Sequence, residues 1–308
     1  MVKKDLLSIY DLSAKEIKII LSTSLELKNK KKNLNVFKGK TLGLLLEEPS
    51  TRTMVSFAVA IVQLGGVPVY LDIEKMQCSR GESIRDTSLV LSRYLSGLMI
   101  RAFKHSYVEE FAKYATIPVI NGLTDYEHPC QVLADVMTIM EFHKARNIEG
   151  LKKIKIVYTG DSNNVANSLL AVSVVLGLDL TIISPKEYLT KKEILNKALE
   201  YVLSTGAEIK ITSDINEVKN ADVIYTDVWT SMGFESEEKK RKKIFMSYQV
   251  NSELLAKASS KCIVLHCLPA TRGEEITADI MTKYEDVIFT QAENRLHVQK
   301  AILLYFIK

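Results

Sequence analysis

The chain has 308 residues, which is long enough for two domains that each bury a core. Hydrophobic residues make up 47% of the sequence and charged residues 25%, which excludes a disordered or fibrous chain. The 41 basic and 37 acidic residues leave a formal net charge of +4, too small to argue for a nucleic acid partner. The longest apolar stretch, 169–178, is about half of a membrane span, so we expect no transmembrane segment.

The N-terminal residues and the cysteines both indicate a cytoplasmic protein. Residues 1–7 show no apolar core followed by a small-residue cleavage site, so the sequence predicts no secretory signal. Cys78, Cys130, Cys262 and Cys267 lie far apart, with no CxxC pair. We therefore expect reduced thiols.

The first half of the chain alternates short apolar runs with amphipathic segments. Strands are predicted at 41–46, 67–71, 97–100 and 117–120. Helices are predicted at 53–64, 83–95, 107–114 and 129–146. A basic run at 28–32 is typical of the solvated end of a helix. Strands that alternate with helices indicate parallel sheets of the βαβ kind.

The same pattern restarts at residue 154. Strands are predicted at 154–158, 180–184, 207–211, 222–226 and 262–265, and helices at 165–176, 191–203, 252–258 and 292–307. The predicted fold class is therefore α/β, with two doubly wound parallel-sheet domains joined by long helices. We expect one domain at 1–146, with the C-terminal helix 291–308 packed back onto it, and the other at 147–290.

The segments after the strands of the first half suit an anion, because ligands bind beyond the carboxyl ends of parallel strands. The first strand is followed, directly before a helix, by Ser50, Thr51, Arg52 and Thr53. Hydroxyls, a guanidinium and the free N–H groups of a helix start favour phosphate, although a Ser/Thr helix cap with an incidental arginine is the alternative. Later strands are followed by Arg101, His128 and Gln131, which favour the anion site.

The corresponding segments of the second half suit an amino-acid-like ligand. Residues 160–164 occupy the position of a dinucleotide-binding loop but lack GxGxxG, which argues against a nicotinamide enzyme. Two further strands lead into 227–233 and 266–269, so the three loops together present Asn, Asp, Ser and Cys side chains.

We expect no metal in this second group. His266 and Cys267 are adjacent at a strand end and should point in opposite directions, and no second pair has ligand spacing. Cys267 as a covalent nucleophile is a further possibility, but His and Asp partners do not lie at a recognisable spacing.

Six separated motifs resemble the aspartate/ornithine carbamoyltransferase family, in the order in which that family has them. They are PSTRT at 49–53, RGESI at 80–84, HPCQVLAD at 128–135, SMG at 231–233, HCLPA at 266–270 and QAENR at 291–295. SMG together with HCLP resembles the ornithine branch, since the aspartate branch is expected to have an arginine where Cys267 stands. The resemblance covers nearly the whole chain.

The resemblance implies carbamoyl transfer from carbamoyl phosphate to the side-chain amine of L-ornithine, with small-molecule substrates and no cofactor. The residues implied for carbamoyl phosphate are Ser50, Thr51, Arg52, Thr53, Gln77, Arg101, His128, Gln131, Cys267, Leu268 and Arg295. Those implied for ornithine are Asn164, Asp227, Ser231 and Met232. Gln77 is expected to reach a neighbouring subunit's site in a homotrimer or an assembly of trimers.

In the implied mechanism, negative charge builds on the carbamoyl oxygen and on the leaving phosphate. The expected catalytic residues are Arg52, Arg101, His128, Asp227, Cys267 and Arg295. Guanidinium groups supply the positive charge, so the mechanism needs no metal. Asp227 and Cys267 are candidates for positioning the neutral amine, and the polar segment 230–243 resembles a lid over ornithine.

Some family positions differ, and two alternatives stay open. Met54 and Ala58 stand where the family often has arginine and glutamate, but neither position binds a ligand. One alternative is a carbamoyltransferase for putrescine or a modified ornithine, although a diamine would leave Asn164 and Ser231 with little to bind. The other alternative is a non-catalytic small-molecule-binding protein on the same scaffold.

Overall fold

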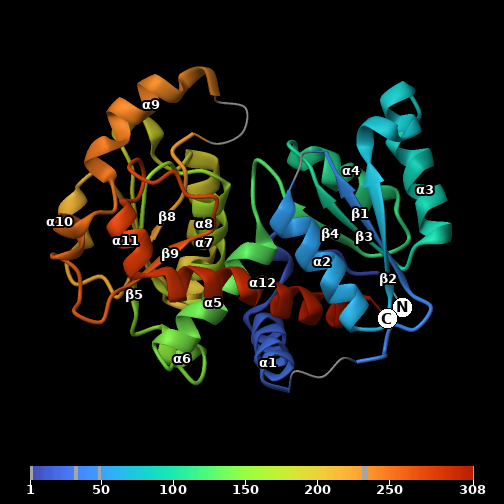
Figure 1. Cartoon of the computed structure of the whole chain (residues 1–308), viewed down its shortest axis with the longest axis horizontal. Helices are drawn as coiled ribbons and strands as arrows, with labels where there is room; N and C mark the ends of the chain where they lie inside the picture. The colour runs from blue at the N-terminus through green and yellow to red at the C-terminus, as the bar shows by residue number, and fades with distance from the viewer. Residues whose placement is uncertain (1–2, 31–33, 48–49, 231–234, 308) are drawn as a thin grey trace. The chain divides into compact units, whose positions relative to one another are not determined.

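The computed structural model describes residues 3–30, 34–47, 50–230 and 235–307. The chain forms two compact units (Figure 1). Unit 1 comprises Met1–Ala134 and Glu293–Lys308, and unit 2 comprises Asp135–Ala292. The domain boundaries expected from the sequence, after residues 146 and 290, stay predictions. The described helices do not include one that is both long enough and apolar enough to span a membrane.

Unit 1 contains a parallel sheet with the order β2-β1-β3-β4. Its strands are β1 (Thr41–Leu46), β2 (Val67–Asp72), β3 (Gly97–Arg101) and β4 (Val119–Leu123). Its helices are α1 (Ala14–Lys30), α2 (Thr51–Gln63), α3 (Ile84–Tyr94) and α4 (His105–Tyr114), with 3₁₀ turns η1 (Ile9–Asp11), η2 (Ile73–Lys75) and η3 (Gln77–Arg80). The chain goes from β1 to one neighbour and then crosses to the other, so β1 and β3 flank the switch point at which such sheets bind ligands.

Unit 2 also contains a parallel sheet, with the strand order β7-β6-β5-β8-β9. Its strands are β5 (Lys155–Thr159), β6 (Asp179–Ile183), β7 (Glu208–Thr212), β8 (Val223–Thr226) and β9 (Ile263–His266). Its helices are α6 (Ile148–Leu151), α7 (Asn164–Leu176), α8 (Lys192–Thr205), α9 (Glu238–Phe245), α10 (Ser252–Leu255) and α11 (Ala278–Lys283). Its 3₁₀ turns are η4 (Lys186–Tyr188), η5 (Ile215–Val218), η6 (Glu235–Glu237) and η7 (Met246–Tyr248). The switch point lies between β5 and β8.

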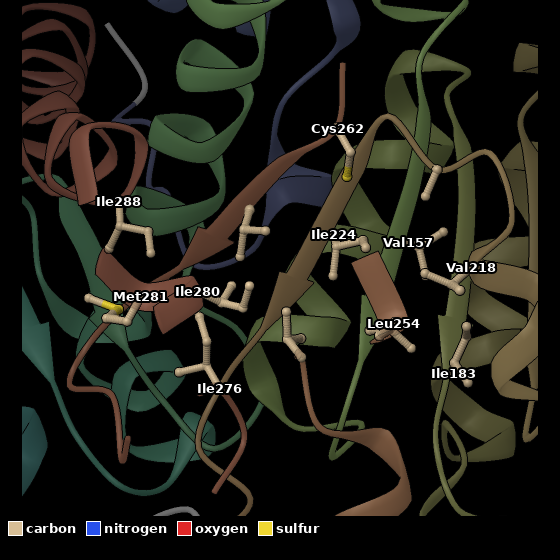
Figure 2. Close-up of a cluster of buried hydrophobic side chains, with 13 residues drawn as sticks. Val157, Ile183, Val218, Ile224, Leu254, Cys262, Ile276, Ile280, Met281 and Ile288 are labelled. Carbon is tan, nitrogen blue, oxygen red and sulfur yellow. The ribbon is translucent and has the colours of Figure 1, made fainter. Parts of the chain in front are cut away.

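A buried apolar cluster supports the strands that carry the functional loops of unit 2. Val157, Ile224 and Val264 contribute side chains from β5, β8 and β9. Ile280 and Met281 of α11 are buried in the same cluster (Figure 2). Close packing in this cluster therefore supports β8 and β9, the strands that lead into Asp227 and Cys267.

Two long helices contain the chain boundaries between the units. Helix α5 (Pro129–Phe142) has its boundary after Ala134, and α12 (Glu285–Phe306) has its boundary after Ala292. The prediction of long connecting helices is confirmed. Helix α5 ends four residues before the predicted residue 146, because Lys144 has a left-handed φ of 54°.

The basic run at 28–32 predicted a helix end there, and α1 covers Ala14–Lys30, whereas the sequence patterns did not indicate α9. Helix α9 overlaps the end of the polar segment 230–243, which was expected to form a lid. Its side chains are mostly charged, and of its residues Arg241 and Phe245 are buried, so it lacks a regular apolar pattern. The described part of 230–243 is therefore helical from Glu238 onward.

Two glycines end neighbouring helices of unit 2 and offer a matched stability test. Gly177 ends α7 with φ of 70°, and a Cβ there would stand 2.5 Å from the carbonyl oxygen of Thr205. Gly206 ends α8 with φ of 73°, and a Cβ there would meet nothing within 4 Å. Left-handed strain of about 1–2 kcal/mol applies to alanine at either position. We expect Gly177→Ala to lower the free energy of unfolding by at least about 1 kcal/mol more than Gly206→Ala in urea titrations. Equal losses would contradict the close approach of Thr205.

Candidate functional site

The start of α2 in unit 1 gathers hydroxyls and guanidinium groups. Ser50 caps the helix, and its Oγ accepts a hydrogen bond from the Thr53 N–H at 3.4 Å. The Thr53 side chain is fully buried, and its Oγ1 accepts from Arg295 Nη2 at 2.7 Å and from Arg101 Nη1 at 3.5 Å. Thr51 is exposed and Arg52 is half-buried in the same first turn. Positive charge beside a helix N-terminus makes this an anion-binding arrangement.

Sheet register fixes the position of Arg101. This residue ends β3 directly opposite Leu46, the last residue of β1. The Glu47 N–H donates to the Arg101 carbonyl oxygen at 2.9 Å, and the Glu47 carboxylate accepts from the Phe103 N–H at 2.7 Å. The two strand exits are therefore tied together, and the guanidinium is delivered to the start of α2.

A buried carboxylate holds the loop that carries His128. Glu127 is 1% exposed, and its carboxylate accepts from the Ser8 hydroxyl at 2.6 Å and from the Ile9 N–H at 2.9 Å. His128 follows directly and is itself buried, and Gln131 lies in the first turn of α5. The N-terminal segment of the chain thus helps to place the imidazole.

Three guanidinium groups influence the imidazole of His128. Burial lowers the pKa of His128 well below 6.5, and the charges of Arg295, Arg101 and Arg52 lower it further. The imidazole is therefore neutral at physiological pH, and it can donate one hydrogen bond without adding charge. Gln77, which is also implied for carbamoyl phosphate, lies on η3 and is exposed, as Thr51 is.

Three adjacent strand ends bring polar groups together in unit 2. The buried Asp227, after β8, accepts from Asn163 Nδ2 at 2.7 Å and from Cys267 Sγ at 3.0 Å. Asn163 follows β5, and Cys267 follows β9. Asn164 is the first residue of α7 and is half-buried, and Leu268 is half-buried beside Cys267. Ser231 and Met232 lie outside the described residues.

Sequence reasoning did not identify Asn163 or Arg241. Asn163 caps α7 by accepting from the Val165 N–H at 2.9 Å, and its position before a helix was the available signal. The buried Arg241 of α9 donates through Nη1 to Asp161 Oδ2 at 2.8 Å and to the Trp229 carbonyl oxygen at 3.0 Å. Burial raises the pKa of Asp161 to about 6, against the opposing charge of Arg241. No local pattern indicated this ion pair.

The expectation that His266 and Cys267 point in opposite directions is wrong. Their ligand atoms and a carboxylate oxygen of Asp227 all lie within 4.8 Å of one another. The regular alternation of a strand ends at His266, and Leu268 has a left-handed φ of 60°. The chain therefore folds back, and the Leu268 N–H donates to His266 Nδ1 at 2.9 Å.

These three side chains fit a metal ion poorly, because their atoms already make protein hydrogen bonds. His266 Nδ1 accepts from the backbone, so Nε2 carries the proton and donates to Glu275 Oε1 at 3.1 Å. Cys267 Sγ donates to Asp227. A metal would have to displace each of these bonds, and the expectation of a metal-free site stays a prediction.

Comparisons with known proteins cover nearly the whole chain. Residues 4–141 match the family model described as aspartate/ornithine carbamoyltransferase, carbamoyl-P binding domain, and residues 152–306 match that of its Asp/Orn binding domain. An ornithine carbamoyltransferase from Methanosphaera stadtmanae is 49% identical over 306 residues, which is 99% of each chain. The structure of ornithine carbamoyltransferase from Pyrococcus furiosus matches with a TM-score of 0.93 and 45% identity, covering 99% of this chain and 97% of that chain. An acetylornithine transcarbamylase complexed with acetylcitrulline matches with a TM-score of 0.88 and 29% identity, covering 99% of each chain.

The lowered pKa of His128 predicts a specific acid sensitivity. Below the ordinary pKa of 6.5 the unfolded chain binds a proton at this histidine and the folded chain does not, so stability falls as the pH falls. The contribution approaches about 1.4 kcal/mol per pH unit. We expect His128→Gln to lose less unfolding free energy than the wild type between about pH 7 and pH 5. Identical pH profiles in urea unfolding would contradict a neutral buried imidazole.

Proposed function

This chain belongs to the aspartate/ornithine carbamoyltransferase family, and from that premise we propose how its two units carry out one reaction. The reaction is transfer of the carbamoyl group of carbamoyl phosphate to the side-chain amine of L-ornithine, which gives L-citrulline and phosphate. The observation that carries this function is the group of Arg52, Arg101 and Arg295 around His128, in the unit that matches a carbamoyl phosphate-binding domain.

Unit 1 binds and polarises carbamoyl phosphate. Arg52, the hydroxyls of Ser50 and Thr51, and the N-terminal N–H groups of α2 hold the phosphate. Arg101 contacts the phosphate and the carbamoyl oxygen, to which the neutral His128 also donates. Removing one such donor from a developing negative charge costs about 2.7–4 kcal/mol of transition-state stabilisation.

Three further side chains support the same substrate. Gln131 holds the carbamoyl amide from the first turn of α5. Thr53 and Arg295 form one hydrogen-bonded pair beside the phosphate, so the guanidinium is fixed before the substrate arrives. Guanidinium groups and N–H donors supply all of the positive potential in this proposal, which therefore requires no cofactor.

Unit 2 binds ornithine and presents its amine. Asn164, Ser231 and Met232 bind the amino-acid end, while Asp227 and Cys267 orient the side-chain amine. An alkylamine with a pKa of about 10.4 is mostly protonated at neutral pH, so the reactive form is the minor neutral one. The neutral amine attacks the carbamoyl carbon, the carbon–oxygen bond to phosphate breaks, and the attacking nitrogen gives up one proton, which the leaving phosphate can accept. The phosphate stays bound at the arginines. Cys267 and Leu268 also lie beside the carbamoyl group in this proposal.

A homotrimer explains the exposed apolar side chains of unit 1. Val55 and Val62 on α2 are 47% and 57% exposed, and Val67 and Tyr70 on the edge strand β2 are 55% and 56% exposed. Apolar surface of this kind is typical of protein interfaces. We propose that neighbouring copies in a homotrimer cover some of these side chains and that the exposed Gln77 completes a neighbour's site.

Free thiols and the name of one relative support a cellular location and a pathway for this protein. Cys78, Cys130, Cys262 and Cys267 are all free thiols, as expected in a reducing compartment. A relative from Pyrococcus furiosus, 46% identical over 304 residues, is named an anabolic ornithine carbamoyltransferase. We infer that this enzyme acts in the cytoplasm, in arginine biosynthesis.

The function is tested with a panel of amines in the presence of carbamoyl phosphate. We expect product from ornithine, with kcat/KM higher than that for putrescine by on the order of 10⁴, because putrescine would leave the polar groups that bind the amino-acid end unpaired. We expect kcat/KM also to be lower for N-acetylornithine, whose acylated α-nitrogen has no charge. Product quantification by mass spectrometry gives the ratio. Preference for another amine would reassign the substrate, and the absence of transfer to every amine would favour the non-catalytic alternative.

Subunit complementation tests the shared site. Arg101→Ala and Gln77→Ala should each inactivate a homotrimer, and reassembly of the two mixed proteins should recover part of the activity. Each mixed trimer then contains at least one site in which neither substituted residue takes part. Activity after mixing is measured against each variant treated alone. If native mass spectrometry shows mixed trimers but activity does not return, each site is contained within one chain.

A further inference from the structure

A buried glutamine of α12 makes two hydrogen bonds of opposite polarity. The side chain of Gln291 is fully buried. Its Nε2 donates to Asp135 Oδ1 at 2.7 Å, and its Oε1 accepts from the His266 N–H at 2.9 Å. The amide therefore connects a carboxylate of α5 with the last residue of β9.

The bond to His266 acts on the backbone next to Cys267. Cys267 follows His266 and donates through Sγ to Asp227. The ring of His266 is separately engaged, by the Leu268 N–H at Nδ1 and by Glu275 at Nε2. Gln291 thus fixes the main chain at the strand end, while the other contacts fix the ring.

We propose that Gln291 is a positioning residue for carbamoyl transfer, because its amide holds the strand end from which Cys267 reaches Asp227. This inference rests on the proposed function, in which Cys267 and Asp227 orient the amine. Gln291 contacts neither substrate in this proposal. It acts through the backbone of His266, and it keeps the buried Asp135 carboxylate hydrogen-bonded.

Only a side chain with a donor at one end and an acceptor at the other satisfies both neighbours. A carboxylate at position 291 could accept from His266, but it would face the carboxylate of Asp135. Other titratable groups nearby are Tyr225, His266 and Glu275. Burial first, and then Asp135, raise the pKa of the Tyr225 phenol well above 10, so this hydroxyl stays protonated.

The test exchanges the hydrogen-bond donor and acceptor between positions 291 and 135. We expect Gln291→Glu to lower kcat/KM for ornithine by roughly ten- to a hundredfold, since small displacements of reacting groups have effects of this size. Adding Asp135→Asn supplies an amide donor to the introduced carboxylate and should restore activity to within about threefold of the wild type. The dissociation constant of carbamoyl phosphate, measured by calorimetry, should stay unchanged in both.

The pH profile separates positioning from general damage. In the Gln291→Glu single variant, two facing buried carboxyl groups can share a proton at low pH but repel each other when both ionise. Its activity relative to the wild type should therefore fall as the pH rises. The double variant should lose this dependence. A single variant that is equally impaired at every pH, or a double variant that is no more active than the single one, would overturn the proposal.

A control and a second readout keep the inference distinct from the proposed function. Gln299→Leu replaces an equally buried amide of α12 whose side-chain atoms have no hydrogen-bond partner among the described residues, and it should leave activity unchanged. In a Cys78→Ser background, Gln291→Leu should speed modification of the Cys267 thiol by a disulfide reagent, while Gln299→Leu should not. If Gln291→Leu leaves the modification rate of Cys267 unchanged, Gln291 does not position this strand end, whether or not the wild type makes citrulline. If the wild type makes no citrulline, that result by itself refutes only the proposed function.

Discussion

Positive charge around a buried imidazole is the constraint on which unit 1 depends. Arg52, Arg101 and Arg295 repel one another, so the surrounding structure must hold their guanidinium groups in place. The sheet register supplies one support at Arg101, and the Thr53 hydroxyl supplies another. An anionic substrate relieves the repulsion, which makes binding and electrostatic preorganisation two results of the same arrangement.

In unit 2 the buried charge has the opposite sign, because it belongs to a carboxylate. Asp227 remains acceptable in the interior since Asn163 and Cys267 both donate to it. These donors follow the strands on either side of β8, so the order of the parallel sheet brings the three polar groups together. In the proposed function, the cationic groups of unit 1 bind the anionic donor and the carboxylate of unit 2 orients the amine.

The sequence predicted the sheets well because apolar runs and strand exits are local signals. Among the strands, 117–120 is the clearest boundary error: β4 begins at Val119, after Pro118, which has no N–H for a ladder bond. Among the helices, the last one begins at Glu285 rather than at the expected residue 292. The contacts of Arg241 and Gln291 could not be predicted, since their partners lie far away in the chain. The directions of His266 and Cys267 were missed because the argument assumed that the strand continued past its last residue.

The hydrogen bonds from Ser8 and Ile9 to Glu127 mean that the N-terminal segment supports the loop that carries His128, although it lies far from this loop in the sequence. Proteolysis or an engineered deletion that removed these residues would strip two donors from a buried carboxylate next to His128, and that carboxylate would then take up a proton or draw in water. A recombinant protein that lacks these residues should therefore lose activity, as a substitution in the active site would. An affinity tag on this enzyme is therefore better placed with a spacer ahead of Lys3 than in exchange for the first dozen residues.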